Sequence, residues 1–126
     1  MLNRTPVLVA EDEIFIALDL ALAIDDAGGE VIGPAASVAE ALDLLATLTV
    51  GGAILDVDLA DGDCSVVAEL LARRHIPTII QTGLEAPPGL RARFPELIVH
   101  SKPCLARTLV TQLETMLVTA GAGRIG

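Results

Sequence analysis

Short apolar runs alternate along the chain with longer stretches in which apolar residues recur at helical spacing. Runs rich in Val, Ile and Leu are typical of strands that are buried on both faces of a sheet. They span Pro6–Ala10, Glu30–Gly33, Ala53–Asp56, Pro77–Thr82 and Leu97–His100. The helical spacing predicts helices over Glu13–Ala27, Ser37–Thr47, Cys64–Arg74 and Leu105–Val118.

Strands that alternate with helices form a parallel sheet, because each connection through a helix crosses over in the right-handed sense. We therefore expect an α/β fold of the flavodoxin-like type, a doubly wound five-stranded parallel sheet with the order (βα)5. The stretch from Gly83 to Pro95 departs from this scheme, because it also contains Pro87 and Pro88. Proline breaks helices, so at most a turn or two around Leu90–Phe94 can be helical, and the fourth helix is short or irregular.

The length and composition bound the size of the core. With 126 residues, the chain is slightly shorter than a typical domain of about 150 residues. We expect a single domain over residues 1–126, with a core from about 5 to 119, a flexible Gly-rich tail at 120–126, and no separate catalytic or DNA-binding domain. Apolar residues make up 52% of the chain and aromatic residues only 2%, so the core must consist of Ala, Val, Leu and Ile.

Charge and patterning exclude several classes of protein. The net charge of −9 repels phosphate backbones, so we expect no nucleic-acid partner. No apolar run approaches the roughly 18 residues that span a bilayer, and the N-terminus lacks the features of a signal peptide. Cys64 and Cys104 are too few and too far apart for a disulfide framework or a zinc site. The sequence therefore predicts a cytoplasmic protein with no membrane segment.

Polar residues gather where the predicted strands end. Glu11 and Asp12 follow the first strand, Asp56 ends the third, and Thr82 ends the fourth. Lys102, the only lysine in the chain, follows the fifth strand. Ligands of open parallel sheets bind outside the carboxyl ends of the strands. We therefore expect these side chains to converge on one pocket.

Carboxylates that are brought together repel one another unless a cation lies among them. Oxygen ligands of this kind suit Mg²⁺, which keeps several waters and often bridges to phosphate. A lysine at the same edge pairs with a carboxylate or a phosphoryl oxygen as a point charge. Such a set neutralises the charge on a transferring phosphoryl group. Asp56, at the end of a central strand, is the natural nucleophile for an aspartyl-phosphate.

These residues match the motifs of a known family. The chain resembles the receiver domain of two-component response regulators, and in length and layout it is similar to the stand-alone chemotaxis-type regulators. The resemblance covers about residues 5 to 119. It rests on four motifs in the family's order, which are Val7–Glu13, Ile54–Asp56, Thr82-Gly83 and Lys102-Pro103.

The resemblance implies a magnesium-dependent phosphoacceptor site. Asp56 looks like the phosphoacceptor, and Glu11 and Asp12 look like the acidic pair that holds Mg²⁺. Asp56 and the backbone carbonyl of Asp58 would complete the metal ligands. The side chain of Asp58 either helps to position attacking water or is only solvated.

The resemblance also implies roles for the remaining strand ends. Thr82 looks like the hydroxyl that moves toward the phosphoryl group, and Lys102 looks like the family's cation. Its bond to Pro103 is commonly cis in this family. Phosphorylation would shift a two-state equilibrium, because the phosphoryl oxygens bind Thr82 and Lys102 better in one state.

The implied function is that of a phosphorelay receiver rather than an enzyme, since such a domain promotes only its own phosphorylation and dephosphorylation. The donor would be a sensor histidine kinase or a histidine phosphotransfer protein. The downstream target would be another protein, of unknown identity. Receivers often dimerise, but nothing in the sequence decides whether this one does.

Two departures from the family's pattern concern the surface through which such a domain signals to its partner. Where receivers usually carry Tyr or Phe in the fifth strand, this chain has Val99, followed by His100, so the usual aromatic switch is absent or replaced. The proline-rich stretch resembles a subset of stand-alone receivers with a short or disordered fourth helix. We expect Leu84–Phe94 to be a loop that becomes ordered on phosphorylation or on partner binding.

A haloacid-dehalogenase-like phosphatase is the alternative. The sequence Asp56-Val57-Asp58 fits the Asp-x-Asp motif with which such enzymes form an aspartyl-phosphate with Mg²⁺. That motif normally lies near the start of the chain, however, and no acidic pair follows Lys102 to supply the enzyme's metal ligands.

Overall fold

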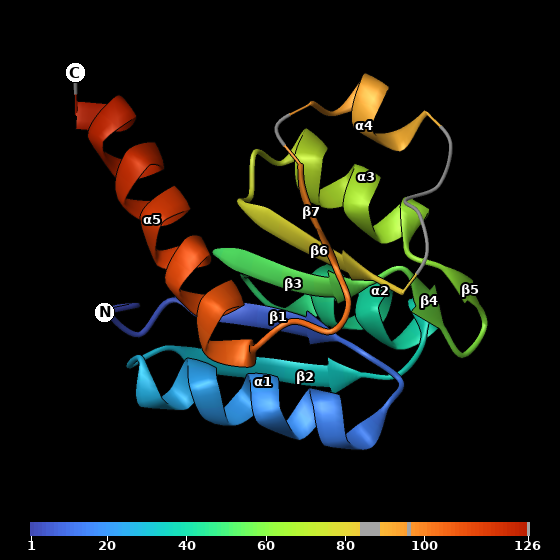
Figure 1. Ribbon diagram of the computed structural model, residues 1–126. Helices are drawn as coiled ribbons and strands as arrows, with labels where there is room; N and C mark the ends of the chain where they lie inside the picture. The colour runs from blue at the N-terminus through green and yellow to red at the C-terminus, as the bar shows by residue number, and fades with distance from the viewer. Residues whose placement is uncertain (84–88, 96, 126) are drawn as a thin grey trace.

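A central parallel sheet organises the computed structural model, which describes residues 1–83, 89–95 and 97–125. The strand order is β2-β1-β3-β6-β7, and every pair in this sheet is parallel (Figure 1). The strands are β1 (Pro6–Ala10), β2 (Glu30–Ala35), β3 (Gly52–Asp56), β6 (Thr78–Thr82) and β7 (Ile98–Ser101). This is the flavodoxin-like arrangement that the alternating pattern predicts.

Helices cover both faces of the sheet. Figure 1 shows α1 and α5 on one side and α2 and α3 on the other, with α4 beyond α3. The helices are α1 (Ile14–Asp26), α2 (Val38–Thr47), α3 (Ser65–Arg73), α4 (Leu90–Arg93) and α5 (Ala106–Ile125). The four-residue α4 is the short fourth helix expected of the proline-rich stretch.

Alternating strand residues build two cores. Val9, Ile54 and Ile79 are neighbours across β1, β3 and β6, and they pack with apolar residues of α1 and α5. Leu55 and Ile80, one position further along, belong to the core on the opposite face. Side chains alternate between the faces of a strand, so fully apolar strands are required to fill both cores.

The loop after Asp56 contains a small hairpin that the sequence does not reveal. Strands β4 (Asp58–Leu59) and β5 (Gly62–Asp63) pair antiparallel where the Asp/Gly-rich pattern indicates only a loop. The Oδ atoms of Asp61 at its tip accept hydrogen bonds from the backbone N–H groups of Val38 (2.6 Å) and Ala39 (3.1 Å) at the start of α2. The hairpin is thus fastened to another element, and local sequence does not encode this contact.

The C-terminal helix is longer than expected. The sequence predicts its end near Val118, whereas α5 continues to Ile125. The flexibility of residues 120–126 stays a prediction. A glycine within a helix costs only about 1 kcal/mol relative to alanine, and extension of an existing helix is far easier than nucleation. The helix therefore runs through Gly121 and Gly123, which are separated by Ala122.

Two further predictions concern the segment Leu84–Phe94 and the absence of a membrane segment. Residues 84–88 lie outside the described part of the chain, so the ordering of the Leu84–Phe94 segment stays a prediction. Among the described residues, no helix is both long and apolar enough to cross a bilayer.

Candidate functional site

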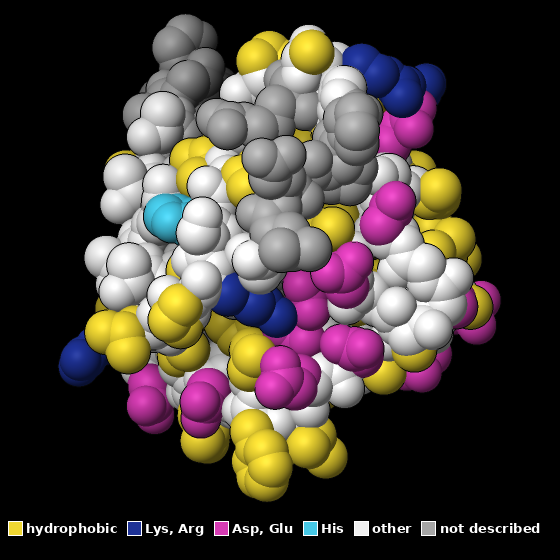
Figure 2. Space-filling view, turned by 45° about the vertical axis from the view of Figure 1, so that its right-hand side comes forward, with side chains coloured by type: hydrophobic (Ala, Val, Ile, Leu, Met, Phe, Trp, Pro, Cys, Tyr) yellow, Lys and Arg dark blue, Asp and Glu magenta, His cyan; other side chains and the backbone are white. Residues whose placement is uncertain are grey.

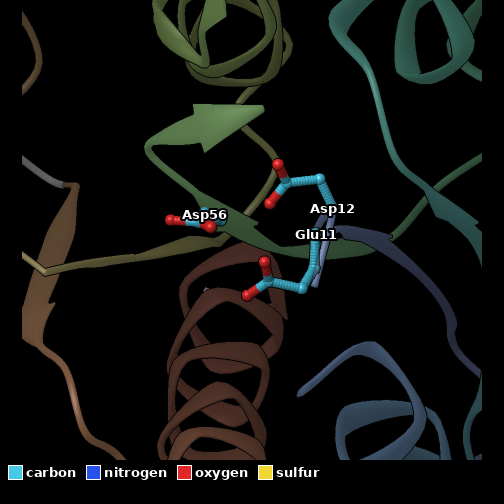
Figure 3. Close-up of side chains that lie close together, drawn as sticks. All are labelled: Glu11, Asp12 and Asp56. Carbon is cyan, nitrogen blue, oxygen red and sulfur yellow. The ribbon is translucent and has the colours of Figure 1, made fainter. Parts of the chain in front are cut away.

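Three carboxylates meet at the carboxyl ends of β1 and β3. Oxygen atoms of Glu11, Asp12 and Asp56, hereafter the acidic cluster, lie within 4.8 Å of one another. Figure 3 shows the three side chains reaching into the same space from two neighbouring strands. Glu11 and Asp56 are buried, with 2% and 4% exposure, whereas Asp12 is exposed. The cluster therefore has a buried side and a side that is open to solvent.

Lys102 joins the acidic cluster from the segment that follows β7. Its Nζ lies 3.0 Å from Asp56 Oδ2 and 3.2 Å from Glu11 Oε1. Burial lowers the pKa of Lys102, but its hydrogen bonds and charge interactions with Asp56 and Glu11 outweigh this effect and raise the pKa above its usual value. The Lys102–Pro103 peptide bond is cis, as the resemblance implies. The expected convergence of Glu11, Asp12, Asp56 and Lys102 is thus present.

Glu11 has the most strongly perturbed carboxyl group of the cluster. Burial, the hydrogen bond to Asp56 and the negative charge of Asp56 raise its pKa from 4.5 to about 7, against the hydrogen bonds from Glu13 and Lys102. The backbone N–H of Glu13 donates to Glu11 Oε2 at 3.1 Å. Burial and the neighbouring carboxylate thus move the pKa of this carboxyl toward neutral pH.

Asp58 and Thr82 lie at the edges of the cluster. The backbone N–H of Asp58 donates to Asp56 Oδ1 at 3.3 Å, while the side chain of Asp58 is exposed. Thr82 is buried at the end of β6, and its backbone carbonyl accepts a hydrogen bond from the N–H of Lys102 at 2.7 Å. The backbone thus connects Thr82 directly to the lysine. The metal-binding role of the Asp58 carbonyl and the movement of the Thr82 hydroxyl stay predictions.

Sequence reasoning missed Gln81. This residue is the β6 partner of Asp56 in the sheet and is 2% exposed. Its Nε2 donates to Glu11 Oε1 at 3.2 Å. The available signal was an amide side chain directly after two apolar residues of a predicted buried strand, since a buried polar group requires a partner.

Comparison with known proteins finds one curated relative, although no protein-family model matches the sequence. The Phyllosphere-induced regulator PhyR of Methylorubrum extorquens is 37% identical over 82 residues, which are 63% of this chain and 31% of PhyR. The chain therefore spans about a third of the length of this relative.

Solved structures of similar fold cover nearly the whole chain. A response regulator receiver domain protein from Methanospirillum hungatei matches with a TM-score of 0.84 and 20% identity, over 94% of this chain and 98% of its own. A response regulator receiver protein from Sinorhizobium medicae matches with a TM-score of 0.78 and 24% identity, over 93% of this chain and 97% of its own. This chain has the fold of a response regulator receiver domain. PhyR from Brucella abortus agrees, with a TM-score of 0.74 and 27% identity over 96% of this chain and 51% of that protein.

The receiver fold argues against the phosphatase alternative. The neighbours have the fold of response regulator receivers, and the carboxylates that accompany Asp56 come from the end of β1, upstream in the chain. Among residues 1–83, 89–95 and 97–125, the only group of acidic side chains arranged to hold a metal ion is the acidic cluster itself. It contains no residue that follows Lys102, where the phosphatase would need its metal ligands.

The donor set of the acidic cluster fits Mg²⁺. All three side chains of the acidic cluster offer oxygen atoms, and the exposed Asp12 leaves room for the water ligands that Mg²⁺ retains. Both oxygens of Glu11 already accept hydrogen bonds from protein groups, as described above. Oε1 accepts two of these bonds and Oε2 only one, so Asp12, Asp56 and Glu11 Oε2 are the better placed to contact an ion directly.

The last strand, β7, contacts α5 through a polar pair. Where the resemblance implies an aromatic residue, the partly buried Val99 packs against the core on the α2 and α3 face. The neighbouring His100 points to the opposite face, where its Nε2 contacts Oε1 of Gln112 in α5. What takes the place of the aromatic switch stays open.

Proposed function

We propose that this domain accepts a phosphoryl group on Asp56 in a Mg²⁺-dependent reaction and signals the modification to another protein. The contact of Lys102 Nζ with both Asp56 and Glu11 carries this proposal. An ammonium held against a buried carboxylate, beside two further carboxylates, is the arrangement needed for charge neutralisation during phosphoryl transfer.

The chemistry is an in-line displacement at phosphorus. A carboxylate oxygen of Asp56 forms the new P–O bond as the P–N bond to the donor imidazole breaks, and the bonding electrons return to the imidazole ring. Lys102 balances the charge on the phosphoryl oxygens, and the backbone N–H of Asp58 orients the Asp56 carboxylate. The carboxylates of the acidic cluster would hold Mg²⁺, which would supply positive charge to neutralise the transferring group.

The product changes which contacts are available to Lys102 and Thr82. Before transfer, Lys102 is shared between two carboxylates. Afterwards a phosphoryl oxygen is the stronger partner, and the Thr82 hydroxyl provides a neutral donor at the end of β6. Since the phosphoryl oxygens favour the state in which both contacts form, phosphorylation shifts the population toward it.

An exposed apolar stripe on α1 is suited to the phosphodonor. Ile14, Phe15, Leu18 and Leu22 are each at least half exposed, and the stripe begins directly after Glu13 at the rim of the acidic cluster. Figure 2 shows apolar side chains projecting below a group of acidic ones on the same face. A protein that presents a phosphohistidine to Asp56 must lie over this rim. We therefore assign the stripe to a histidine kinase or a histidine phosphotransfer protein.

Intact mass spectrometry after incubation with acetyl phosphate and Mg²⁺ tests the proposal. The parent chain should gain one phosphoryl mass, and chelation of Mg²⁺ should prevent the gain. Asp56→Asn should gain nothing, whereas Asp58→Asn, which alters an exposed acid two residues away, should still be modified. A gain on Asp56→Asn, or none on the parent chain, would contradict the proposal.

A further inference from the structure

Gln81 reaches the acidic cluster from β6, the strand next to β3 in the sheet. It lies beside Asp56 in the sheet register, and its side chain is buried. Glu11 Oε1 also accepts from the Lys102 ammonium, so this oxygen is an acceptor and the amide nitrogen of Gln81 must face it. The contact of Nε2 with Glu11 Oε1, at 3.2 Å, is therefore a defined donor–acceptor pair.

The two oxygens of Glu11 are held by three donors from different parts of the chain. Oε2 accepts from the backbone N–H of Glu13, which precedes α1. Oε1 accepts from Gln81 in β6 and from Lys102 after β7. Only Lys102 has a second partner in the cluster, because its Nζ also contacts Asp56.

This sharing gives Gln81 a distinct task. If Lys102 turns toward a phosphoryl oxygen on Asp56, Glu11 Oε1 loses its ammonium partner while remaining buried. A buried carboxylate oxygen without a donor is costly. The amide of Gln81 keeps that oxygen paired without adding a positive charge, which would repel a divalent cation.

We propose that Gln81 is a positioning residue, which holds the Glu11 carboxylate in the orientation that the metal site requires and frees Lys102 for the phosphoryl group. This proposal rests on the proposed function. It differs from it in that Gln81 touches neither the reacting atoms nor the metal, and acts through Glu11.

Calorimetric titration with Mg²⁺, in the absence of any phosphodonor, tests the proposal. Gln81→Met keeps an unbranched side chain of similar size but removes the donor. Loss of hydrogen-bonding partners behind metal ligands typically weakens metal binding by about 10- to 100-fold, and we expect a loss of about tenfold here. At saturating Mg²⁺, phosphorylation by acetyl phosphate should remain measurable, because Asp56 and Lys102 are intact.

Thr78→Val is the matched control. It removes a buried hydroxyl from the same strand, where Thr78 Oγ1 donates to the carbonyl of Ile76 at 2.9 Å, far from the acidic cluster along β6. The control should leave the Mg²⁺ dissociation constant within about twofold of the parent value even if it lowers thermal stability. An unchanged constant in Gln81→Met, or an equal loss in the control, would overturn the proposal.

A second measurement needs no substitution. In the parent chain, the side-chain amide signal of Gln81 in a ¹⁵N-resolved NMR spectrum should move as Mg²⁺ is added. A signal that stays in place while backbone signals near Asp12 move would overturn the proposal. If Mg²⁺ binds and moves the Gln81 signal but acetyl phosphate leaves the chain unmodified, the proposed function fails while the contact between Gln81 and Glu11 stands.

Discussion

The side chain of Glu11 is subject to opposing effects on its protonation. Burial and the neighbouring charge of Asp56 favour its protonated form, while Lys102, Gln81 and the N–H of Glu13 donate to it. Three carboxylates lie together and one ammonium contacts two of them, so negative charges in the cluster repel one another. A divalent cation bound here would relieve this repulsion, which supports the proposed Mg²⁺ site.

The raised pKa of Glu11 predicts how stability depends on pH. The folded-state pKa of Glu11, about 7, lies above the ordinary 4.5. The contribution of protonated Glu11 to stability is therefore complete below about pH 4.5 and is lost as the pH rises through about 7. The free energy of unfolding of the metal-free chain should fall over this interval, by on the order of 3 kcal/mol more than in Glu11→Gln. Denaturant unfolding of both chains in a chelator measures the difference.

Magnesium provides the check on that prediction. Above pH 7 the ionised Glu11 no longer opposes metal binding, so added Mg²⁺ should restore stability to the parent chain and restore less to Glu11→Gln. A parent chain and Glu11→Gln with parallel pH profiles would show that Glu11 does not titrate in this range.

At the scale of elements, the β4–β5 hairpin couples the loop after Asp56 to α2. Asp61 caps two backbone N–H groups of that helix, and the N–H of Ala60 donates to the carbonyl of Ala36 at 3.0 Å. Both contacts bridge segments that lie more than twenty residues apart in the sequence. The position of Asp58, and with it the orientation of the Asp56 carboxylate, thus depends on the start of α2.

Removal of the cap should destabilise the chain in a pH-dependent way. The hydrogen bond from Val38 is the main cause of the lowered pKa of Asp61, so the stabilisation is present above about pH 3.8 and is lost as the pH falls through the lowered value. Asp61→Ala should therefore lower the midpoint of thermal unfolding by a few degrees at neutral pH and by less in acid. Asp61→Asn, which keeps an acceptor oxygen, should lose less; equal losses would show that the cap contributes nothing.

The assignment of the exposed α1 stripe predicts that its removal slows phosphoryl transfer from a protein donor but not from a small-molecule donor. In the double variant Phe15→Ala and Leu22→Ala, transfer from a phosphorylated histidine phosphotransfer protein should slow by about tenfold, because buried apolar anchors dominate protein interfaces. Phosphorylation by acetyl phosphate should be unchanged. Radiolabel transfer measured in parallel with both donors tests this. Val118→Ala, at an exposed apolar site on α5, is the control, and an equal slowing there would contradict the assignment.

At the scale of the whole molecule, the features that repeat along the chain were predictable. The apolar strands specified a parallel sheet, and a parallel sheet brings its carboxyl ends to one edge. The meeting of Glu11, Asp12 and Asp56 with Lys102, which lies 91 positions after Glu11, follows from that topology. The topology alone is enough to place these residues together, without knowledge of any single side-chain contact.

The features that depend on one long-range contact were not predictable. Gln81 meets Glu11 across 70 positions of sequence, and Asp61 meets Val38 across 23. Both contacts depend on side-chain conformations within the packed fold rather than on a periodic pattern. The extension of α5 beyond Val118 was not predicted for a different reason. Gly121 and Gly123 suggest the end of a helix by composition, but an established helix tolerates them.

The most direct test of the central claim locates the phosphoryl group on the chain. Borohydride reduces an aspartyl-phosphate to homoserine, so treatment of the parent chain after acetyl phosphate and Mg²⁺, followed by peptide mass spectrometry, identifies the modified residue. Homoserine at position 56, and no conversion of Glu11, Asp12 or Asp58, is the predicted result. Conversion at any of those three acids in place of Asp56, or at no residue, would contradict the account.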